Sequence, residues 1–336
     1  MFAYIEIIYS KINLLSLPRK KTTMQQLKQW LQTTPYKEYR LTVASADASF
    51  RKYYRLQTNN ESVLVMDASL EKESLGPFLD ITQRLLSVGV QAPQILLQNT
   101  QLGYLVIEDF GSVDLLSTLT HNNFQTLYKQ AINVITTMQH ADISHLPLYD
   151  KAFLLQEMGL MQTWYLEKKL TLTLTNTQHA MVQNTLNTIA DVVLQQPQNC
   201  FVHRDFHSRN IMVKEDGGFG IIDYQDAMNG SITYDLVSLL KDCYISFEPK
   251  AIEELALYFY EQNGINSSKE EFLMWFDFTG MQRHIKVLGI FSRLSLRDNK
   301  HGYLQDIPLT RNYLIQTAKK YPQTQPLATF LEENTQ

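Results

Sequence analysis

The sequence predicts an α+β protein with two lobes, a small N-terminal lobe built on an antiparallel sheet and a larger, mainly helical C-terminal lobe. Three observations support this. The length of 336 residues exceeds that of one ordinary domain. Residues 41–56 (LTVASADASFRKYYRL) have the pattern of strand, short polar turn and strand. Beyond Gly111 the pattern changes to long helical stretches.

The N-terminal lobe is expected over residues 24–108, after an extension (1–23) that is either poorly ordered or precedes a true start at Met24. Leu27, Trp30 and Leu31 have helical spacing and predict an opening amphipathic helix. The expected elements then follow in the order strand, strand, strand (SVLVMDA), a helix opened by Pro77, and the strands QILLQ and GYLVIEDF.

The C-terminal lobe is expected over residues 109–336. Its helical stretches are predicted at 123–140, 151–170, 178–195, 232–245, 250–262 and 270–295. Between Cys200 and Tyr224, however, the strand-like runs CFVH, IMVK and FGIID bracket a polar loop. Polar residues in this β island are candidates for chemistry.

Composition excludes several classes of protein. Apolar residues make up 44% of the chain and charged residues 19%, which is ordinary for a globular protein. A net charge of −4 gives no general attraction to nucleic acid or to anionic lipid. No stretch approaches the roughly 18 to 20 apolar residues of a spanning helix. We therefore expect a cytoplasmic monomer that binds neither nucleic acid nor membrane.

The strongest motif is the segment HRDFHSRN at residues 203–210, followed by the apolar run that ends in Asp223. Phosphoryl transfer needs a carboxylate to orient the attacking hydroxyl and hard oxygen ligands to fix magnesium. Asp205 fits the first task, and Asn210 and Asp223 fit the second. A single loop aspartate is usually a solvated or capping residue, so the prediction depends on the joint pattern, which is the kinase signature set. Arg209 and His207 could contact phosphate or sugar, or brace the loop.

These residues resemble the aminoglycoside phosphotransferase and choline kinase superfamily, whose fold is protein-kinase-like. The strings SADASFRKYYRL, VLVMDA, VIEDFG, FVHRDFHSRNIMV, GIIDYQDAMNGSITYDLVSLL and QRHIKVLGIFSRLSLRDNKHGYLQDIP look more specifically like the bacterial N-acetylmuramate/N-acetylglucosamine anomeric kinases of cell-wall recycling. The resemblance extends from about residue 24 to about residue 322. It implies ATP (or GTP) and Mg²⁺ as cofactors and an amino sugar as the small-molecule partner.

In this family the turn between the first two strands covers the nucleotide phosphates, and here it contains Ser45, Asp47 and Ser49 but no glycine. The alternative is a plain hairpin. The segment at Glu108 resembles the family's hinge, whose backbone pairs with the nucleobase. Leu64 and Ile222 are the candidates to pack on the two faces of that nucleobase, although both would also be core residues in any fold. Asp109 is not assigned to magnesium.

The kinase pattern places a lysine at the end of the third strand, where this sequence has Met66. Either a cation of the preceding strand replaces that lysine or activity has been lost. Among Arg51, Lys52 and Arg55 we favour Arg51, with Glu73 as the residue that holds it. Strand alternation places Arg51 and Arg55 on one face and Lys52 on the other.

The substrate side offers a basic stripe on the last predicted helix, formed by Arg283, Lys286, Arg293 and Arg297. It is either a solvated or salt-bridged surface, or an anion site for a lactyl carboxylate or a phosphate. Asp226 and Asp298 could accept hydrogen bonds from sugar hydroxyls, whereas Asp235 is expected to cap its helix and brace the catalytic loop.

Three functions stay open at this point. The first is an ATP-dependent kinase acting on the anomeric hydroxyl of N-acetylmuramate or N-acetylglucosamine. The second is phosphorylation of an aminoglycoside, choline or homoserine. The third is a catalytically silent nucleotide-binding pseudokinase, which Met66 makes conceivable.

Overall fold

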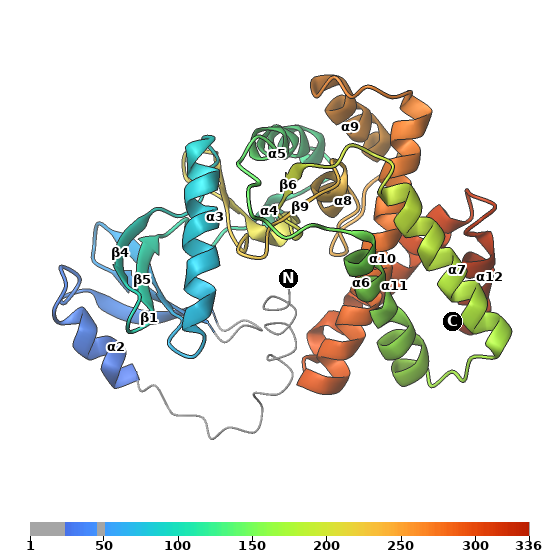
Figure 1. Ribbon diagram of the computed structural model, residues 1–336. Coiled ribbons are helices and arrows are strands. Elements are labelled where there is room, and N and C mark those ends of the chain that lie inside the picture. Colours follow the sequence, from blue (N-terminus) through green and yellow to red (C-terminus); the bar gives the residue numbers. More distant parts are fainter. Residues whose placement is uncertain (1–23, 46–50, 336) are drawn as a thin grey trace. The chain divides into compact units, whose positions relative to one another are not determined.

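The computed structural model describes residues 24–45 and 51–335 (Figure 1). Their contacts divide the chain into two compact units. The first unit holds the described residues up to Leu75 together with Ile95–Asp109, and the second holds Gly76–Gln94 and the residues from Phe110 onward. The first contains an antiparallel sheet and the second is mainly helical, so the predicted α+β class is confirmed.

The sheet of the first unit has five strands in the order β1-β2-β3-β5-β4, and each neighbouring pair is antiparallel. Its strands are β1 (Arg40–Ser45), β2 (Lys52–Gln57), β3 (Ser62–Asp67), β4 (Ile95–Asn99) and β5 (Tyr104–Glu108). The predicted meander and the two later strands are therefore confirmed.

One face of this sheet is covered by helix α2 (Met24–Leu31). The buried face of α2 consists of Leu27, Trp30 and Leu31, as predicted, and it packs with Tyr54, Leu56, Val63, Val65, Tyr104 and Val106. Because strand side chains alternate, Arg55, Leu64 and Met66 lie on the opposite face.

The second unit contains the remaining helices. They are α3 (Leu75–Ser87), α4 (Leu115–Thr118), α5 (Phe124–Met138), α6 (Lys151–Leu160), α7 (Asn176–Val193), α8 (Tyr234–Leu240), α9 (Pro249–Gln262), α10 (Lys269–Asp298), α11 (Ile307–Ala318) and α12 (Gln325–Asn334). The predicted stretches are confirmed, although α8 ends five residues before the predicted end at residue 245. The short α4 was missed, and so were α11 and α12. Each of the last two has a proline in its first turn, a start signal that the sequence offered.

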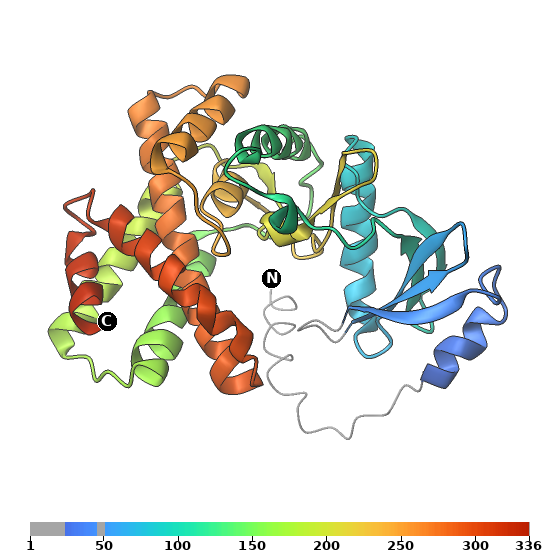
Figure 2. The same cartoon turned by 180° about the vertical axis from the view of Figure 1, so that it is seen from behind.

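Helix α10 lies at the centre of this unit, where it contacts α6, α7, α8 and α11 (Figures 1 and 2). It is therefore buried on several sides, and Arg283 and Lys286 are only 3% and 4% exposed. Gly289 permits one of these contacts, because a Cβ there would lie 2.4 Å from the backbone of Leu160. At that point α6 continues as a π-helix, Met161–Lys169, which the sequence did not predict.

The β island consists of two short antiparallel pairs. Strand β6 (Cys200–Val202) pairs with β9 (Met228–Gly230), and β7 (Ile211–Val213) pairs with β8 (Phe219–Ile221). Three of these strands were predicted, and β9, with the sequence MNG, was not. Among the described helices none is both long and apolar enough to cross a bilayer.

Candidate active site

The HRDFHSRN segment forms a loop that leads from β6 into β7 and ends in a 3₁₀ turn, η4 (Ser208–Asn210). The pairing of β7 with β8 returns the chain beside this loop, and Ile222 N donates to the carbonyl of Asn210 at 3.1 Å. The side-chain amide of Asn210 in turn donates to the carbonyl of Asp205 at 2.9 Å. The structure thus brings Asp205, Asn210 and the segment that carries Asp223 together.

Two buried carboxylates at α8 and its C-terminal end fix this loop. Asp235 accepts from the backbone N–H groups of His203 at 2.7 Å and Arg204 at 3.0 Å. Asp242 accepts from the backbone N–H of Ser208 at 2.9 Å. Arg204 has a φ of +78°, a strained conformation for a non-glycine residue that needs such support.

The expectation that Asp235 braces the loop is confirmed, but it makes no cap hydrogen bond to its own helix in the described chain. Asp242 was missed. Asp242 lies two residues beyond the end of α8, so helical spacing offered no signal for it.

The carboxylate of Asp205 is partly exposed and surrounded by positive charge. Its side chain is 42% exposed, and its Oδ1 lies 3.5 Å from Nη1 of Arg283. The same Nη1 donates to the carbonyl of Arg204 at 2.6 Å. Burial acts to raise the pKa of Asp205, but the charges of Lys286, Arg283 and Arg204 outweigh it and lower that pKa below its ordinary value. Asp205 is therefore ionised at neutral pH.

A second carboxylate, Glu157 on α6, lies at the centre of this positive charge. Arg204 donates to Glu157 at 2.5 Å, Lys286 lies at 3.3 Å, Gln282 donates at 3.3 Å, and the hydroxyl of Tyr149 also donates to it. We call these five residues the Glu157 cluster. Burial would raise the pKa of Glu157, but Lys286 and Arg204 lower it. No motif in the sequence indicated this residue, which lies inside a long helical stretch.

The predicted basic stripe on α10 is not one surface. Arg283 and Lys286 are buried and have internal partners, whereas Arg297 is exposed and pairs with its neighbour Asp298 at 2.8 Å. Arg293 is half-buried. The sugar contacts expected of Arg283 and Lys286 therefore stay predictions, and the contacts that the structure does show are with the catalytic loop and the Glu157 cluster.

The residues predicted to hold magnesium have suitable chemistry. Asp223 has a φ of +64°, and its Oδ1 accepts from Gln225 at 2.9 Å. Although much of its side chain is open to solvent, the surrounding protein and the charges of Asp205 and Asp226 raise its pKa. A cation would relieve this repulsion. No group of three or more His, Cys, Asp or Glu able to hold a metal occurs in the described chain. Few protein ligands, here Asn210 and Asp223, are typical of Mg²⁺ on a nucleotide.

The remaining loop residues have varied surroundings. The guanidinium of Arg209 lies 3.6 Å from the centroid of the Tyr244 ring, and His207 meets the same ring edge-on at 5.2 Å. Burial lowers the pKa of His207, so its imidazole is neutral. Asp226 is exposed, and its backbone carbonyl accepts from Arg204 at 3.3 Å.

In the first unit, Arg51 and Arg55, two of the three candidates to replace the lysine absent at position 66, differ in their contacts. Arg55 forms a bidentate pair with Asp109 at 2.6 and 2.9 Å, so its charge is already matched. The Nε of Arg51, which is 8% exposed, donates to Ser74 at 3.2 Å. Glu73, expected to hold Arg51, is the exposed residue next to that serine.

The other nucleotide-side residues lie at strand ends or within strands. Asp47 and Ser49 lie outside the described residues. Ser45 ends β1, opposite Tyr53, and Glu108 ends β5. Leu64 is a half-buried residue of β3. Ile222, in the second unit, follows β8, and its carbonyl lies 3.0 Å from Nε2 of His203.

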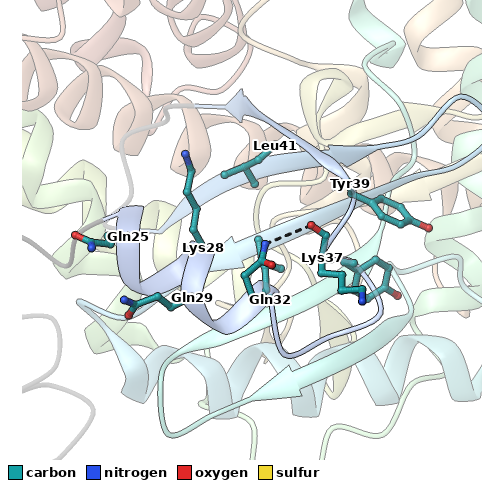
Figure 3. A pocket seen from close by; sticks show the side chains of 9 residues that line it. Gln25, Lys28, Gln29, Gln32, Lys37, Tyr39 and Leu41 are labelled. Atoms are coloured by element: carbon teal, nitrogen blue, oxygen red, sulfur yellow. Dashed lines mark hydrogen bonds between the residues drawn. The ribbon is translucent and has the colours of Figure 1, made fainter.

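A hollow of about 420 Å³ lies beside α2 in the first unit. Figure 3 shows that its wall is formed by polar side chains such as Gln25, Lys28 and Gln32, together with Tyr39, which precedes β1, and Leu41 of β1. It contains none of the predicted site residues.

Known proteins with related sequences agree with the predicted resemblance. Residues 40–266 match the model of the phosphotransferase enzyme family. An N-acetylmuramate/N-acetylglucosamine kinase of Neisseria meningitidis is 38% identical over 320 residues, which cover 92% of this chain and 95% of that protein. A protein of the same name from Pseudomonas aeruginosa is 36% identical over 297 residues, 87% of each chain.

Solved structures confirm the fold. A choline kinase from Streptococcus pneumoniae superposes with a TM-score of 0.61 at 14% identity, covering 87% of this chain and 98% of that one. An ADP-bound aminoglycoside phosphotransferase gives a TM-score of 0.59 at 15% identity, covering 88% and 97%. The predicted protein-kinase-like fold is therefore confirmed. Since both the family model and the relatives cover more than half of its length, this chain belongs to the phosphotransferase enzyme family.

Proposed function

We propose that this chain is a kinase that transfers the γ-phosphoryl group of ATP to the anomeric hydroxyl of N-acetylmuramate or N-acetylglucosamine. The observation that carries the proposal is the hydrogen-bonded arrangement of Asp205, Asn210 and Ile222. It supports a site in which Asp205 is the base and Asn210 and Asp223 are the metal ligands. The names of the relatives at 38% and 36% identity support the choice of sugar.

Asp205 orients the attacking hydroxyl in this proposal. Its ionised carboxylate accepts a hydrogen bond from the sugar, and its lowered pKa makes it a weak base that takes the proton late. A late proton transfer suits phosphoryl transfer, whose transition state is loose and needs positioning more than deprotonation. The anomeric hydroxyl is also more acidic than the other hydroxyls of a sugar, so a weak base is sufficient.

Asn210 and Asp223 would hold Mg²⁺, which when bound neutralises charge on the phosphates. For the nucleotide, ATP or GTP, we propose phosphate contacts from the β1–β2 turn and from Arg51, and base contacts from strand residues. The proposed set is Ser45, Asp47, Ser49, Arg51, Glu73, Leu64, Glu108 and Ile222. For the sugar we propose Asp226 and Arg209, while the buried Arg283 and Lys286 act through Asp205.

We further propose that the protein works as a cytoplasmic monomer in peptidoglycan recycling. A phosphate at the anomeric carbon is the form in which a salvaged amino sugar can enter group-transfer reactions. The proposal therefore expects a free amino sugar as the substrate rather than a polymer or a nucleotide sugar.

The test is to incubate the purified protein and magnesium with ATP or GTP and with N-acetylmuramate, N-acetylglucosamine, kanamycin, choline or homoserine. The product is followed by phosphorus NMR, which distinguishes an anomeric phosphate from other esters. Formation of a sugar 1-phosphate is expected. Turnover of kanamycin, choline or homoserine alone would favour the other phosphotransferases, and nucleotide binding with no turnover of any acceptor would indicate a pseudokinase.

A further inference from the structure

Arg209 differs from the other cations around the catalytic loop, Arg204, Arg283 and Lys286. Each of those three forms an ion pair with a carboxylate, either Glu157 or Asp205. Arg209 has no ion pair with any carboxylate of residues 24–45 or 51–335. A half-buried guanidinium whose charge is not matched internally is expected to meet an anion from outside.

The contacts of Arg209 hold its guanidinium in a position from which it can bind a ligand. Its guanidinium lies over the face of Tyr244 at 3.6 Å, and Tyr244 is itself flanked by the rings of His207 at 5.2 Å and Phe291 at 6.4 Å. Stacking uses the face of a guanidinium and leaves the N–H donors at its edge available. Within the described chain no side-chain hydrogen bond uses these donors.

The backbone of Arg209 is also held firmly. Arg209 is the middle residue of η4, between Ser208, which is tied to Asp242, and Asn210, which is tied to Asp205. The guanidinium therefore starts from the same short loop that carries the proposed base. A ligand bound at Asp205 through one hydroxyl has its other substituents within reach of this loop.

A carboxylate that is influenced by the charge of Arg209 is Asp306, on the 3₁₀ helix η5 (His301–Asp306). Its Oδ2 is buried and has no hydrogen-bond partner in the described chain. Burial and the charge of Asp242 raise the pKa of Asp306, while Arg209 lowers it. Arg209 and Asp306 form no ion pair in the described chain.

We propose that Arg209, presented on the ring of Tyr244, binds the lactyl carboxylate of N-acetylmuramate and so favours this sugar over N-acetylglucosamine. The inference rests on the proposed function and assigns one substituent of the substrate to one side chain. A planar guanidinium with two free edge donors is suited to a bidentate pair with a carboxylate. N-acetylglucosamine has no such group, so only one of the two sugars gains from the contact.

The test compares catalytic efficiency with the two sugars at saturating ATP in the full-length protein. Arg209→Gln should lower the ratio of kcat/KM for N-acetylmuramate to that for N-acetylglucosamine about tenfold, the usual effect of losing a charge-assisted pair. Arg209→Lys, which keeps the charge but loses the planar fork, should lower the ratio by less. Arg297→Gln is the matched control, since Arg297 is exposed and paired with Asp298, and it should leave the ratio as in the parent.

Tyr244 gives an independent check. Tyr244→Phe keeps the ring and should keep the preference, whereas Tyr244→Leu should reduce it, with melting temperatures measured for all variants. An equal loss with both sugars in Arg209→Gln, or a raised KM for ATP, would overturn the inference, because Arg209 would then serve the loop or the phosphates. If the parent phosphorylates neither sugar, the proposed function fails as well. If it phosphorylates both and the ratio does not change, only this inference fails.

Discussion

Two buried carboxylates of the helical unit, Glu157 and Asp277, have the same kind of surroundings and different neighbours. Each contacts two cations and accepts a hydrogen bond from one tyrosine hydroxyl. The Glu157 cluster includes Arg204 of the catalytic loop. Asp277, on α10, has no partner from that loop in the described residues.

The partners of Asp277 show what its cluster joins. Lys241, at the end of α8, lies at 2.7 Å, and Lys320 and Tyr321, which follow α11, each lie at 3.0 Å. We call these four residues the Asp277 cluster. It connects three helical segments at points remote in sequence. Burial acts to raise the pKa of Asp277, but Lys241 and Lys320 lower it.

The comparison of the Glu157 and Asp277 clusters shows that a buried ion pair does not by itself indicate an active site. Taking charges out of water is costly, and such pairs are weak evidence for stabilisation, although breaking one strongly destabilises the fold. Both clusters should therefore respond alike when stability is measured. Only the Glu157 cluster, which positions Arg204 and Lys286 around Asp205, should also respond when turnover is measured.

The largest effect is expected for Asp205, the proposed base beside the Glu157 cluster. Asp205→Asn removes the acceptor of the hydroxyl proton and should lower kcat by at least about a hundredfold, because general-base contributions are roughly 10² to 10⁴. Nucleotide affinity, measured by calorimetry, should change little. Near-normal turnover would remove Asp205 from the mechanism and leave the Glu157 cluster with no catalytic partner.

The second prediction compares the clusters directly. Glu157→Gln takes the carboxylate from Arg204 and Lys286, and Asp277→Asn takes it from the buried Lys241 and the exposed Lys320. Because each change leaves at least one buried cation without a carboxylate, each should lower the free energy of unfolding by about 3 kcal/mol. Glu157→Gln should in addition lower kcat about tenfold, because Arg204 and Lys286 lose their anchor. Urea unfolding and saturation kinetics on the same preparations check both effects. A loss of kcat in Asp277→Asn that matches the loss in Glu157→Gln would show that turnover follows stability alone.

The sequence predicted the part of this site whose residues are close along the chain. Asp205 and Asn210 lie in one loop, and Asp223 follows one short hairpin later, so local pattern was sufficient. Glu157 lies on α6, and only the packing of α6 against α10 brings it to Lys286. That contact depends on the tertiary fold, which the spacing of residues within one helix does not contain.

The basic stripe on α10 also shows that spacing within a helix does not predict tertiary contacts. Helical periodicity correctly predicts that Arg283, Lys286 and Arg297 share a side of the helix. It cannot predict that neighbouring helices cover the first two and leave Arg297 in solvent. The fold class was predictable because the meander and the long helices are strongly periodic, whereas α11 and α12 were missed although a proline marks the start of each.

The third prediction concerns the charge that the surroundings place on Asp205. Nearby cations hold its pKa below the ordinary value, so the acid limb of kcat should lie below the usual titration range of an aspartate. Arg283→Gln removes one of these cations and should move that limb upward by about one pH unit. Lys241→Met, in the Asp277 cluster, is the control and should leave the limb in place. An acid limb that is the same in the parent and in Arg283→Gln would contradict the electrostatic role of Arg283.

The smallest expected effect concerns His284, which lies beside the Asp277 cluster with its Nε2 3.0 Å from the carbonyl of Lys241. Burial lowers the pKa of His284 from 6.5 to about 3, so the folded protein keeps it neutral. The unfolded chain takes up a proton near the ordinary value, so this group makes stability fall as the pH decreases from about 6.5 to about 3.

His284→Gln keeps an amide donor for Lys241 and removes the titration. The free energy of unfolding of the variant should therefore depend less steeply on pH between 6 and 4, by up to about 1.4 kcal/mol per pH unit. One pH unit below the ordinary value the difference amounts to about 1 kcal/mol. Turnover at neutral pH should stay as in the parent, because the contact belongs to the Asp277 cluster and not to the catalytic loop. Identical slopes for parent and variant would mean that His284 is protonated in the folded protein, and that the surroundings of Asp277 are more open to water than those of Glu157.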